Sequence, residues 1–161
     1  MEIASNSREE TLRLGETIGA ELKPGDIVLL FGDLGSGKTT LTQGISNGLG
    51  LKKGEYIRSP TFTIINEYEG RCPIYHMDLF RVETFAEAQN LGLEEYFFGV
   101  GVVVVEWAEK LFAGKNPEKS IGFGIESRVE IRISMSGDDR RFFDIRCVNR
   151  EDGGSLLFAL Q

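Results

Sequence analysis

Hydrophobic residues follow two different patterns in the first third of the chain. Apolar residues at positions 14–22 recur every four residues behind a capping-box pattern that starts at Ser7, which predicts a helix over residues 8–22. The run Ile27–Phe31 is apolar throughout and predicts a buried strand. A glycine-rich loop follows, and Thr39–Leu49 predicts a second helix. These residues therefore predict a strand–loop–helix unit.

The middle of the chain predicts further strands. Thr61–Tyr68 and Pro73–Met77 are rich in β-branched and aromatic residues, and the turn residues 69–71 separate them, which predicts a hairpin. A short helix is expected over Glu83–Leu91. The valine run in Gly101–Val105 is typical of a central strand in a parallel sheet, because both of its faces are apolar.

Apolar and polar residues alternate near the C-terminus. The alternation runs over Val129–Met135 and Phe143–Cys147, with a turn at residues 136–139, and predicts an antiparallel hairpin. Residues 113–127 show no clear pattern, and we expect the tail from Asn149 to fray. The order of elements predicts an α/β fold: a P-loop NTPase-like domain with a central, mostly parallel sheet, flanking helices and an antiparallel C-terminal hairpin.

Length and composition favour a single soluble domain. The 161 residues are 41% hydrophobic, so we expect one core and one domain over residues 1–161. No apolar run is long enough to span a bilayer, and residues 1–10 are too polar for a signal peptide, so we expect a cytoplasmic protein without membrane contact. Cys72 and Cys147 lack metal-ligand spacing and are expected to be reduced.

The acidic charge restricts any role with nucleic acid. A net charge of -7 and a pI near 4.9 argue against a broad basic face that grips phosphates. A nucleic-acid role would be indirect, or confined to small patches such as Lys52-Lys53 and Arg140-Arg141.

The loop after the first strand carries the strongest chemical signal. Residues 32–39 match the pattern G-x-x-x-x-G-K-[ST] in full. Its glycines allow backbone N–H groups to converge on phosphate oxygens, while the next helix directs its N-terminal dipole at the same anion. Lys38 is expected to reach the β- and γ-phosphates, and the Thr39 hydroxyl to bind Mg²⁺. The expected nucleotide contacts are Asp33, Leu34, Gly35, Ser36, Gly37, Lys38, Thr39, Thr40 and, from a later loop, Thr61.

The loop Ser59-Pro60-Thr61 has two interpretations. It could be a switch-like segment whose hydroxyl senses Mg²⁺ or the γ-phosphate, or simply a loop in which proline sets the bend into the next strand.

Two carboxylates follow predicted strands. Asp78 follows one strand and Glu106 follows another, and in open α/β folds ligands bind at this edge of the sheet. Phosphoryl chemistry needs an acidic residue near the metal and a group that orients water, although either residue could be a capping carboxylate. His76 alone is more typical of a hydrogen-bonded structural residue than of a catalyst. Trp107 is expected to pack and to position Glu106, although an aromatic side chain next to the site could also contact a partner or a base.

Together these motifs resemble the bacterial tRNA threonylcarbamoyladenosine biosynthesis ATPase family (TsaE-type). The resemblance extends from about residue 7 to residue 112. The matching segments are Gly32-Asp33-Leu34-Gly35-Ser36-Gly37-Lys38-Thr39-Thr40, Ser59-Pro60-Thr61-Phe62, His76-Met77-Asp78-Leu79-Phe80-Arg81, Gly92-Leu93-Glu94-Glu95-Tyr96 and Val105-Glu106-Trp107-Ala108-Glu109.

The resemblance implies a small, slow ATPase that uses ATP and Mg²⁺. Such proteins work with two larger partners, which install threonylcarbamoyl on the tRNA adenosine beside the anticodon, so tRNA is contacted only indirectly. By this resemblance Thr39 and Glu106 hold Mg²⁺ and Asp78 is linked to hydrolysis, and the predicted catalytic residues are Lys38, Asp78 and Glu106. Phe80 departs from the family's usual tyrosine, and Ser36 replaces a common alanine.

Two other functions remain open. A small-molecule kinase could use the same fold, although residues 109–127 contain no arginine for a phosphate-covering lid. A nucleotide-gated binding module with incidental hydrolysis needs the same loop and metal, so sequence does not separate it from an ATPase.

Overall fold

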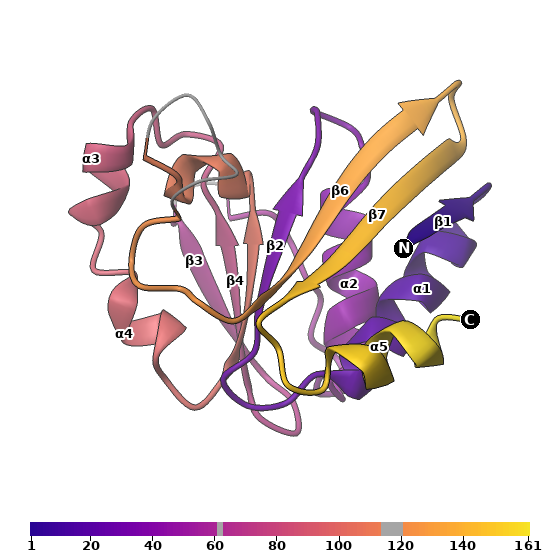
Figure 1. Cartoon of the computed structure of the whole chain (residues 1–161), viewed down its shortest axis with the longest axis horizontal. Helices are drawn as coiled ribbons and strands as arrows, with labels where there is room; N and C mark the ends of the chain where they lie inside the picture. The colour runs from indigo at the N-terminus through magenta and orange to yellow at the C-terminus, as the bar shows by residue number, and fades with distance from the viewer. Residues whose placement is uncertain (61–62, 114–120) are drawn as a thin grey trace.

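The computed structural model describes residues 1–60, 63–113 and 121–161 (Figure 1). The strands in these ranges are β1 (Glu2–Ser5), β2 (Ile27–Phe31), β3 (Ile65–Glu69), β4 (Pro73–Asp78), β5 (Val102–Glu106), β6 (Arg128–Ser136) and β7 (Arg140–Val148). They form one sheet in the order β1-β7-β6-β2-β5-β4-β3. The central strands β6, β2, β5 and β4 run parallel, and the outer strands pair antiparallel.

Helices cover the sheet from both faces. They are α1 (Arg8–Glu21), α2 (Lys38–Gly48), α3 (Phe85–Gln89), α4 (Glu94–Phe97), α5 (Gly153–Ala159) and the short 3-10 helix η1 (Ala108–Leu111). In Figure 1 α1, α2 and α5 lie on one side of the sheet and α3 and α4 on the other. One apolar core lies between the sheet and α1, α2 and α5, and a second lies under α3, α4 and η1. None of the helices in the described ranges has the length and hydrophobicity needed to cross a membrane.

Glycines bring α1 and α2 into close contact. Gly15 and Gly19 on α1 lie against Gly44 and Gly48 on α2, one turn apart on each helix. A Cβ atom at Gly19 would lie only 2.1 Å from the carbonyl oxygen of Ile45. Because side chains are absent here, the two backbones touch directly. This contact fixes α2, whose first turn continues the glycine-rich loop of residues 32–39, named the phosphate loop for its sequence pattern.

Arg71 ties the β3–β4 turn to the C-terminal ends of the same two helices. Its guanidinium donates to the carbonyl oxygen of Gly48 at 2.6 Å and to those of Gly19 and Leu22 at 2.7 and 2.6 Å. These carbonyls lie at the C-terminal ends of the helices, where intrahelical N–H groups run out, and that of Gly19 also accepts the Leu22 N–H at 3.3 Å. One cation therefore satisfies acceptors on α1 and α2 at once and favours the negative ends of both helix dipoles.

The sheet brings the ends of three parallel strands to one edge. In the β4–β5 register Asp78 lies opposite Glu106, and in the β2–β5 register Leu30 does. The loop after β2 therefore starts beside both carboxylates. This arrangement follows from parallel pairing, because parallel strands end at the same side of a sheet.

The predicted α/β fold is confirmed, and most predicted elements are present. Residues 61–62 lie outside the described ranges, and the strand predicted over Thr61–Tyr68 starts only at Ile65. The helix expected over Glu83–Leu91 is shorter, because Thr84 accepts the capping hydrogen bond that starts α3. Strand β1, which is only four residues long, was not predicted at all. It exists because it pairs with β7.

The expectation of a frayed tail from Asn149 is wrong. The tail forms α5, and Leu156 is fully buried against the core on the α1 side of the sheet. Arg150, just before it, donates to both carboxylate oxygens of Asp26 at 3.1 and 2.9 Å and to the carbonyl oxygen of Glu21 at 2.8 Å. Long-range burial and this ion pair therefore order a segment whose local composition is unremarkable.

Candidate functional site

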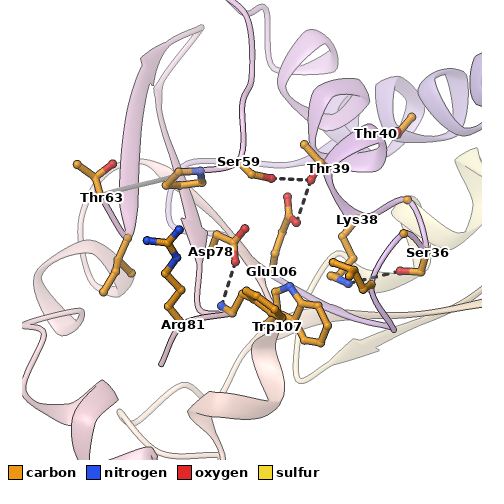
Figure 2. A pocket seen from close by; sticks show the side chains of 16 residues that line it. Ser36, Lys38, Thr39, Thr40, Ser59, Thr63, Asp78, Arg81, Glu106 and Trp107 are labelled. Atoms are coloured by element: carbon orange, nitrogen blue, oxygen red, sulfur yellow. Dashed lines mark hydrogen bonds between the residues drawn. The ribbon is translucent and has the colours of Figure 1, made fainter. Parts of the chain in front are cut away.

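A cavity of about 490 Å³ opens at the edge where β2, β4 and β5 end (Figure 2). Three parts of the chain line it: the phosphate loop with the start of α2, the segment around Ser59, and the residues at and after the ends of β4 and β5. The lining side chains include Ser36, Lys38, Thr39, Thr40, Asp78, Phe80, Arg81, Glu106 and Trp107. Polar groups thus converge on one hollow, as expected of a ligand site.

The backbone of the loop forms a cradle for an anion. Gly35 and Gly37 have φ angles of 78° and 104°, a region that disfavours residues with a Cβ. Gly37 is the N-cap of α2 and offers no side chain to bond the first turn. The N-terminal N–H groups of an α-helix have no intrahelical partner, so those of α2 remain available to a ligand in the cavity.

Lys38 bonds to the loop itself. Its ammonium donates to the carbonyl oxygens of Gly32 at 2.6 Å and Asp33 at 2.9 Å, and the side chain is buried. Burial lowers the pKa of Lys38, while the nearby carboxylates of Glu106 and Glu109 oppose that shift. The amine is therefore held against the cavity and satisfied by neutral acceptors, which an anionic ligand can replace.

Thr39 and Glu106 meet inside the cavity. The Thr39 hydroxyl lies 3.1 Å from Oε2 of Glu106 and 2.9 Å from the Ser59 hydroxyl (Figure 2). Glu106 is only 2% exposed. The other carboxylate oxygen, Oε1, lies 2.8 Å from Nε2 of His76 and 3.3 Å from the Thr42 hydroxyl. A buried carboxylate is thus surrounded by polar groups from α2 and β4.

This cluster fits a magnesium ion bound together with phosphates. Hydroxyl and carboxylate oxygens are the ligands that Mg²⁺ prefers, and in phosphate sites it keeps water and substrate oxygens as its other ligands. Across the described residues, no group of three or more His, Cys, Asp or Glu side chains could hold a metal without such additional ligands. Thr39 and Glu106 offer two oxygen ligands, so a Mg²⁺ ion held there would need further oxygen ligands such as water or phosphate.

Asp78 lines the same cavity beside Glu106. Its Oδ1 accepts the backbone N–H of Phe80 at 3.0 Å. Burial raises the pKa of the Asp78 carboxyl above its ordinary value, the Phe80 hydrogen bond opposes this, and the charge of Glu106 adds to it. Arg81 extends along the cavity next to Asp78 (Figure 2). Asp78 is thus a carboxylate whose proton affinity is raised in a ligand-sized hollow, as in many catalytic sites.

Trp107 closes the cavity beside Lys38. The residue has a φ of 59°, which is rare for a bulky side chain, and it turns the chain sharply between β5 and η1. The Lys38 ammonium lies 3.9 Å from the centroid of the indole ring, and the Phe80 ring packs on the indole with centroids 5.0 Å apart. The strained turn therefore places an aromatic face against the loop cation.

Comparison with known proteins gives the family. A family model described as "Threonylcarbamoyl adenosine biosynthesis protein TsaE" matches residues 5–142 of the chain. The chain belongs to the TsaE family. The resemblance predicted from the motifs is thereby confirmed.

Individual relatives agree with this TsaE assignment. A "tRNA threonylcarbamoyladenosine biosynthesis protein TsaE" from Bacillus subtilis is 46% identical over 134 residues, which cover 83% of this chain and 77% of the relative. The protein of the same name from Treponema pallidum is 39% identical over 86% of this chain and 96% of its own length. The crystal structure of Bacillus subtilis YdiB superposes with a TM-score of 0.73 and 37% identity, covering 99% of this chain and 93% of that one.

In this TsaE-family chain the structure brings most of the predicted site residues together. Loop residues 34–40 line one cavity with Asp78 and Glu106. Asp33 contributes its carbonyl oxygen to Lys38, and its side chain is not part of the cavity wall. Thr61 lies outside the described residues, whereas Ser59 of the same segment reaches Thr39.

Sequence reasoning missed Thr42 in the TsaE-family site, and it predicted a hydrogen-bonded structural role for His76 without naming the partner, Glu106. Thr42 lies one turn after Thr39 on α2, and the helical period places both hydroxyls on one face. His76 lies two residues before Asp78 on β4, so strand alternation places both on the same face of the sheet, beside Glu106. Both spacings were available in the sequence, but only the structure shows that the two side chains meet the same carboxylate.

Proposed function

We propose that this chain binds ATP with Mg²⁺ in the cavity and hydrolyses it slowly in support of tRNA threonylcarbamoylation. The main support is the meeting of Thr39 and Glu106 at 3.1 Å beside the phosphate loop, which combines a metal-ligand pair with an anion cradle. Membership of the TsaE family supplies the process that this nucleotide chemistry serves.

The residues would act through position and charge. The open N–H groups of α2 bind phosphate oxygens, and Lys38 leaves the carbonyls of Gly32 and Asp33 to bond the β- and γ-phosphates. Thr39 and Glu106 hold Mg²⁺, which neutralises charge developing on the β- and γ-phosphate oxygens when it is bound. Asp78 orients the attacking water, and its raised pKa suits it to accept a proton late in the reaction.

The cycle of ATP binding and hydrolysis would support a complex of this chain with partner proteins. We place this chain with the two larger proteins that form threonylcarbamoyladenosine, in the cytoplasm, where each round of hydrolysis resets the complex. Direct binding of tRNA has little electrostatic support, because the chain carries a net charge of -7.

The test compares two lysine variants. Lys38→Ala removes the cation next to the phosphate loop, and Lys53→Ala removes an exposed lysine outside the cavity. We expect Lys38→Ala to lose ATP binding in calorimetric titration, to keep a wild-type circular dichroism spectrum, and to stop repeated rounds of tRNA modification in a reconstituted assay. Lys53→Ala should match the wild type in each measurement.

Two results would contradict the proposal. Unchanged ATP affinity in Lys38→Ala would remove the nucleotide site. Undiminished multiple-turnover modification with a non-hydrolysable ATP analogue would show that occupancy alone is sufficient and would favour the nucleotide-gated module.

A further inference from the structure

The buried face of β4 carries a histidine between Ile74 and Asp78 of the same strand, with Asn66 as its partner on β3. His76 is fully buried and points to the α2 side of the sheet, between Ile74 on the same strand and Val104 on β5. Burying an imidazole costs free energy unless its nitrogens find partners. Within the described residues, Nδ1 finds none, and Nε2 lies 2.8 Å from Oε1 of Glu106. The contact with Glu106 is therefore the one that compensates for burial.

The proton in this contact can be assigned. A carboxylate only accepts hydrogen bonds, so Nε2 of His76 carries the hydrogen and donates it to Oε1. The other candidate donor is the Thr42 hydroxyl, which has a single proton. That hydroxyl lies 2.9 Å from the carbonyl oxygen of Lys38 and 3.3 Å from Oε1 of Glu106, so its proton favours the carbonyl. His76 is thus the firm donor to Oε1.

The two oxygens of Glu106 consequently have different tasks. Oε1 is bonded to the protein interior, and Oε2 faces Thr39 at the cavity wall, at 3.1 Å. Rotation of the carboxylate would break the bond to His76 and leave a buried donor without a partner, which costs about 1–3 kcal/mol. The hydrogen bond from His76 to Oε1 therefore fixes the orientation of Oε2, the oxygen that faces the cavity.

We propose that His76 is a positioning residue that fixes the Glu106 carboxylate for Mg²⁺, so that the metal affinity of the nucleotide complex depends on its Nε2–H. This inference rests on the proposed function, because it assumes that Glu106 and Thr39 hold the metal. Donors behind a metal ligand orient it and raise its affinity, and their loss typically weakens metal binding about 10–100-fold.

Paired substitutions separate positioning from packing. In His76→Gln the amide nitrogen can reach the position of Nε2, whereas in His76→Asn it reaches only the position of Nδ1 and leaves Oε1 without this donor. His76→Leu is a second donor-free variant, which fills the space of the ring with an apolar side chain. Thermal unfolding identifies the variants that are folded, and Glu106→Gln is the reference for loss of the ligand itself.

The readout is metal affinity, not turnover. Mg²⁺ is titrated into the full chain saturated with the β,γ-imido analogue of ATP, by calorimetry or by fluorescence of Trp107, the only tryptophan of the chain, which lies in the cavity wall. Binding of the analogue is also measured in EDTA. We expect His76→Asn and His76→Leu to weaken Mg²⁺ binding about 10–100-fold, His76→Gln to stay within about threefold of the wild type, and binding in EDTA to be unchanged in all three.

The outcomes distinguish this inference from the proposed function. If Glu106→Gln weakens Mg²⁺ binding while the donor-free variants do not, the positioning role is wrong and the metal site stands. If the donor-free variants weaken binding of the ATP analogue by the same factor in EDTA and in Mg²⁺, His76 is only a packing residue. The same conclusion follows if His76→Gln binds Mg²⁺ as weakly as His76→Asn. If Glu106→Gln leaves Mg²⁺ affinity intact, the metal assignment falls and this inference falls with it.

Discussion

The contact between α1 and α2 allows a sharp prediction for Gly19→Ala. An added Cβ would lie 2.1 Å from the carbonyl oxygen of Ile45, 2.9 Å from its carbonyl carbon and 3.0 Å from the Cα of Gly48. Ordinary contacts between heavy atoms are about 3.5 Å, so the helices would have to separate by roughly 1 Å. The obstructing atoms belong to backbone, which cannot change rotamer to make room.

The cost follows from this separation. Overpacking a core typically costs 1–3 kcal/mol, and a gap of about 1 Å also forfeits dispersion contacts along the whole helix pair. We therefore expect Gly19→Ala to lower the free energy of unfolding by about 3 kcal/mol or more. For a domain of this size that corresponds to a Tm decrease of roughly 6–12 °C. Since α2 starts at the phosphate loop, ATP affinity should decrease as well.

Gly154→Ala is the matched control. Gly154 lies in α5, and a Cβ there would meet nothing within 4 Å. The same chemical change should be neutral or stabilise by up to about 1 kcal/mol, because alanine loses less backbone entropy in a helix. Urea denaturation of both variants measures the difference. If Gly19→Ala were as stable as Gly154→Ala, the close backbone packing of α1 on α2 would be refuted.

Three further predictions concern other parts of the molecule. Asp78→Asn should lower single-turnover ATP hydrolysis while preserving ATP binding. Because the folded-state pKa of Asp78 lies above its ordinary value of 3.8, ionisation of this carboxyl destabilises the folded protein. The variant should therefore be more stable than the wild type at pH 7 and lose this advantage as the pH falls below 3.8. Thermal unfolding against pH tests the sign, and an unchanged Tm at pH 7 would contradict it. Arg71→Ala should lower the free energy of unfolding, measured by urea denaturation, by about 1–3 kcal/mol. Arg71→Lys should restore only part of this loss, because one ammonium does not span two helix ends. Equal stability of the wild type and both variants would show that the Arg71 hydrogen bonds do not stabilise the fold. The isolated chain, with its charge of -7, should show no salt-sensitive tRNA binding in a filter-binding series at near-physiological ionic strength, and tight binding that weakens steeply with salt would overturn the indirect role.

Local sequence patterns were sufficient for the elements that carry the site. The strand at Ile27–Phe31, the glycines of the loop and the helix after it are encoded within a few residues of one another, since hydrophobic period and permitted backbone angles are local properties. The positions of Asp78 and Glu106 at strand ends were predictable for the same reason, because each directly follows its own apolar run.

Contacts between distant segments were decided only by the tertiary structure. The four-residue strand β1 forms through pairing with β7, and α5 is ordered by burial of Leu156, although neither segment has a strong local signal. The same holds within the site: His76 and Thr42 reach Glu106 across separations of 30 and 64 residues. Local patterns specify which face a side chain occupies, but only the packing of α2 on the sheet specifies which partner it meets there.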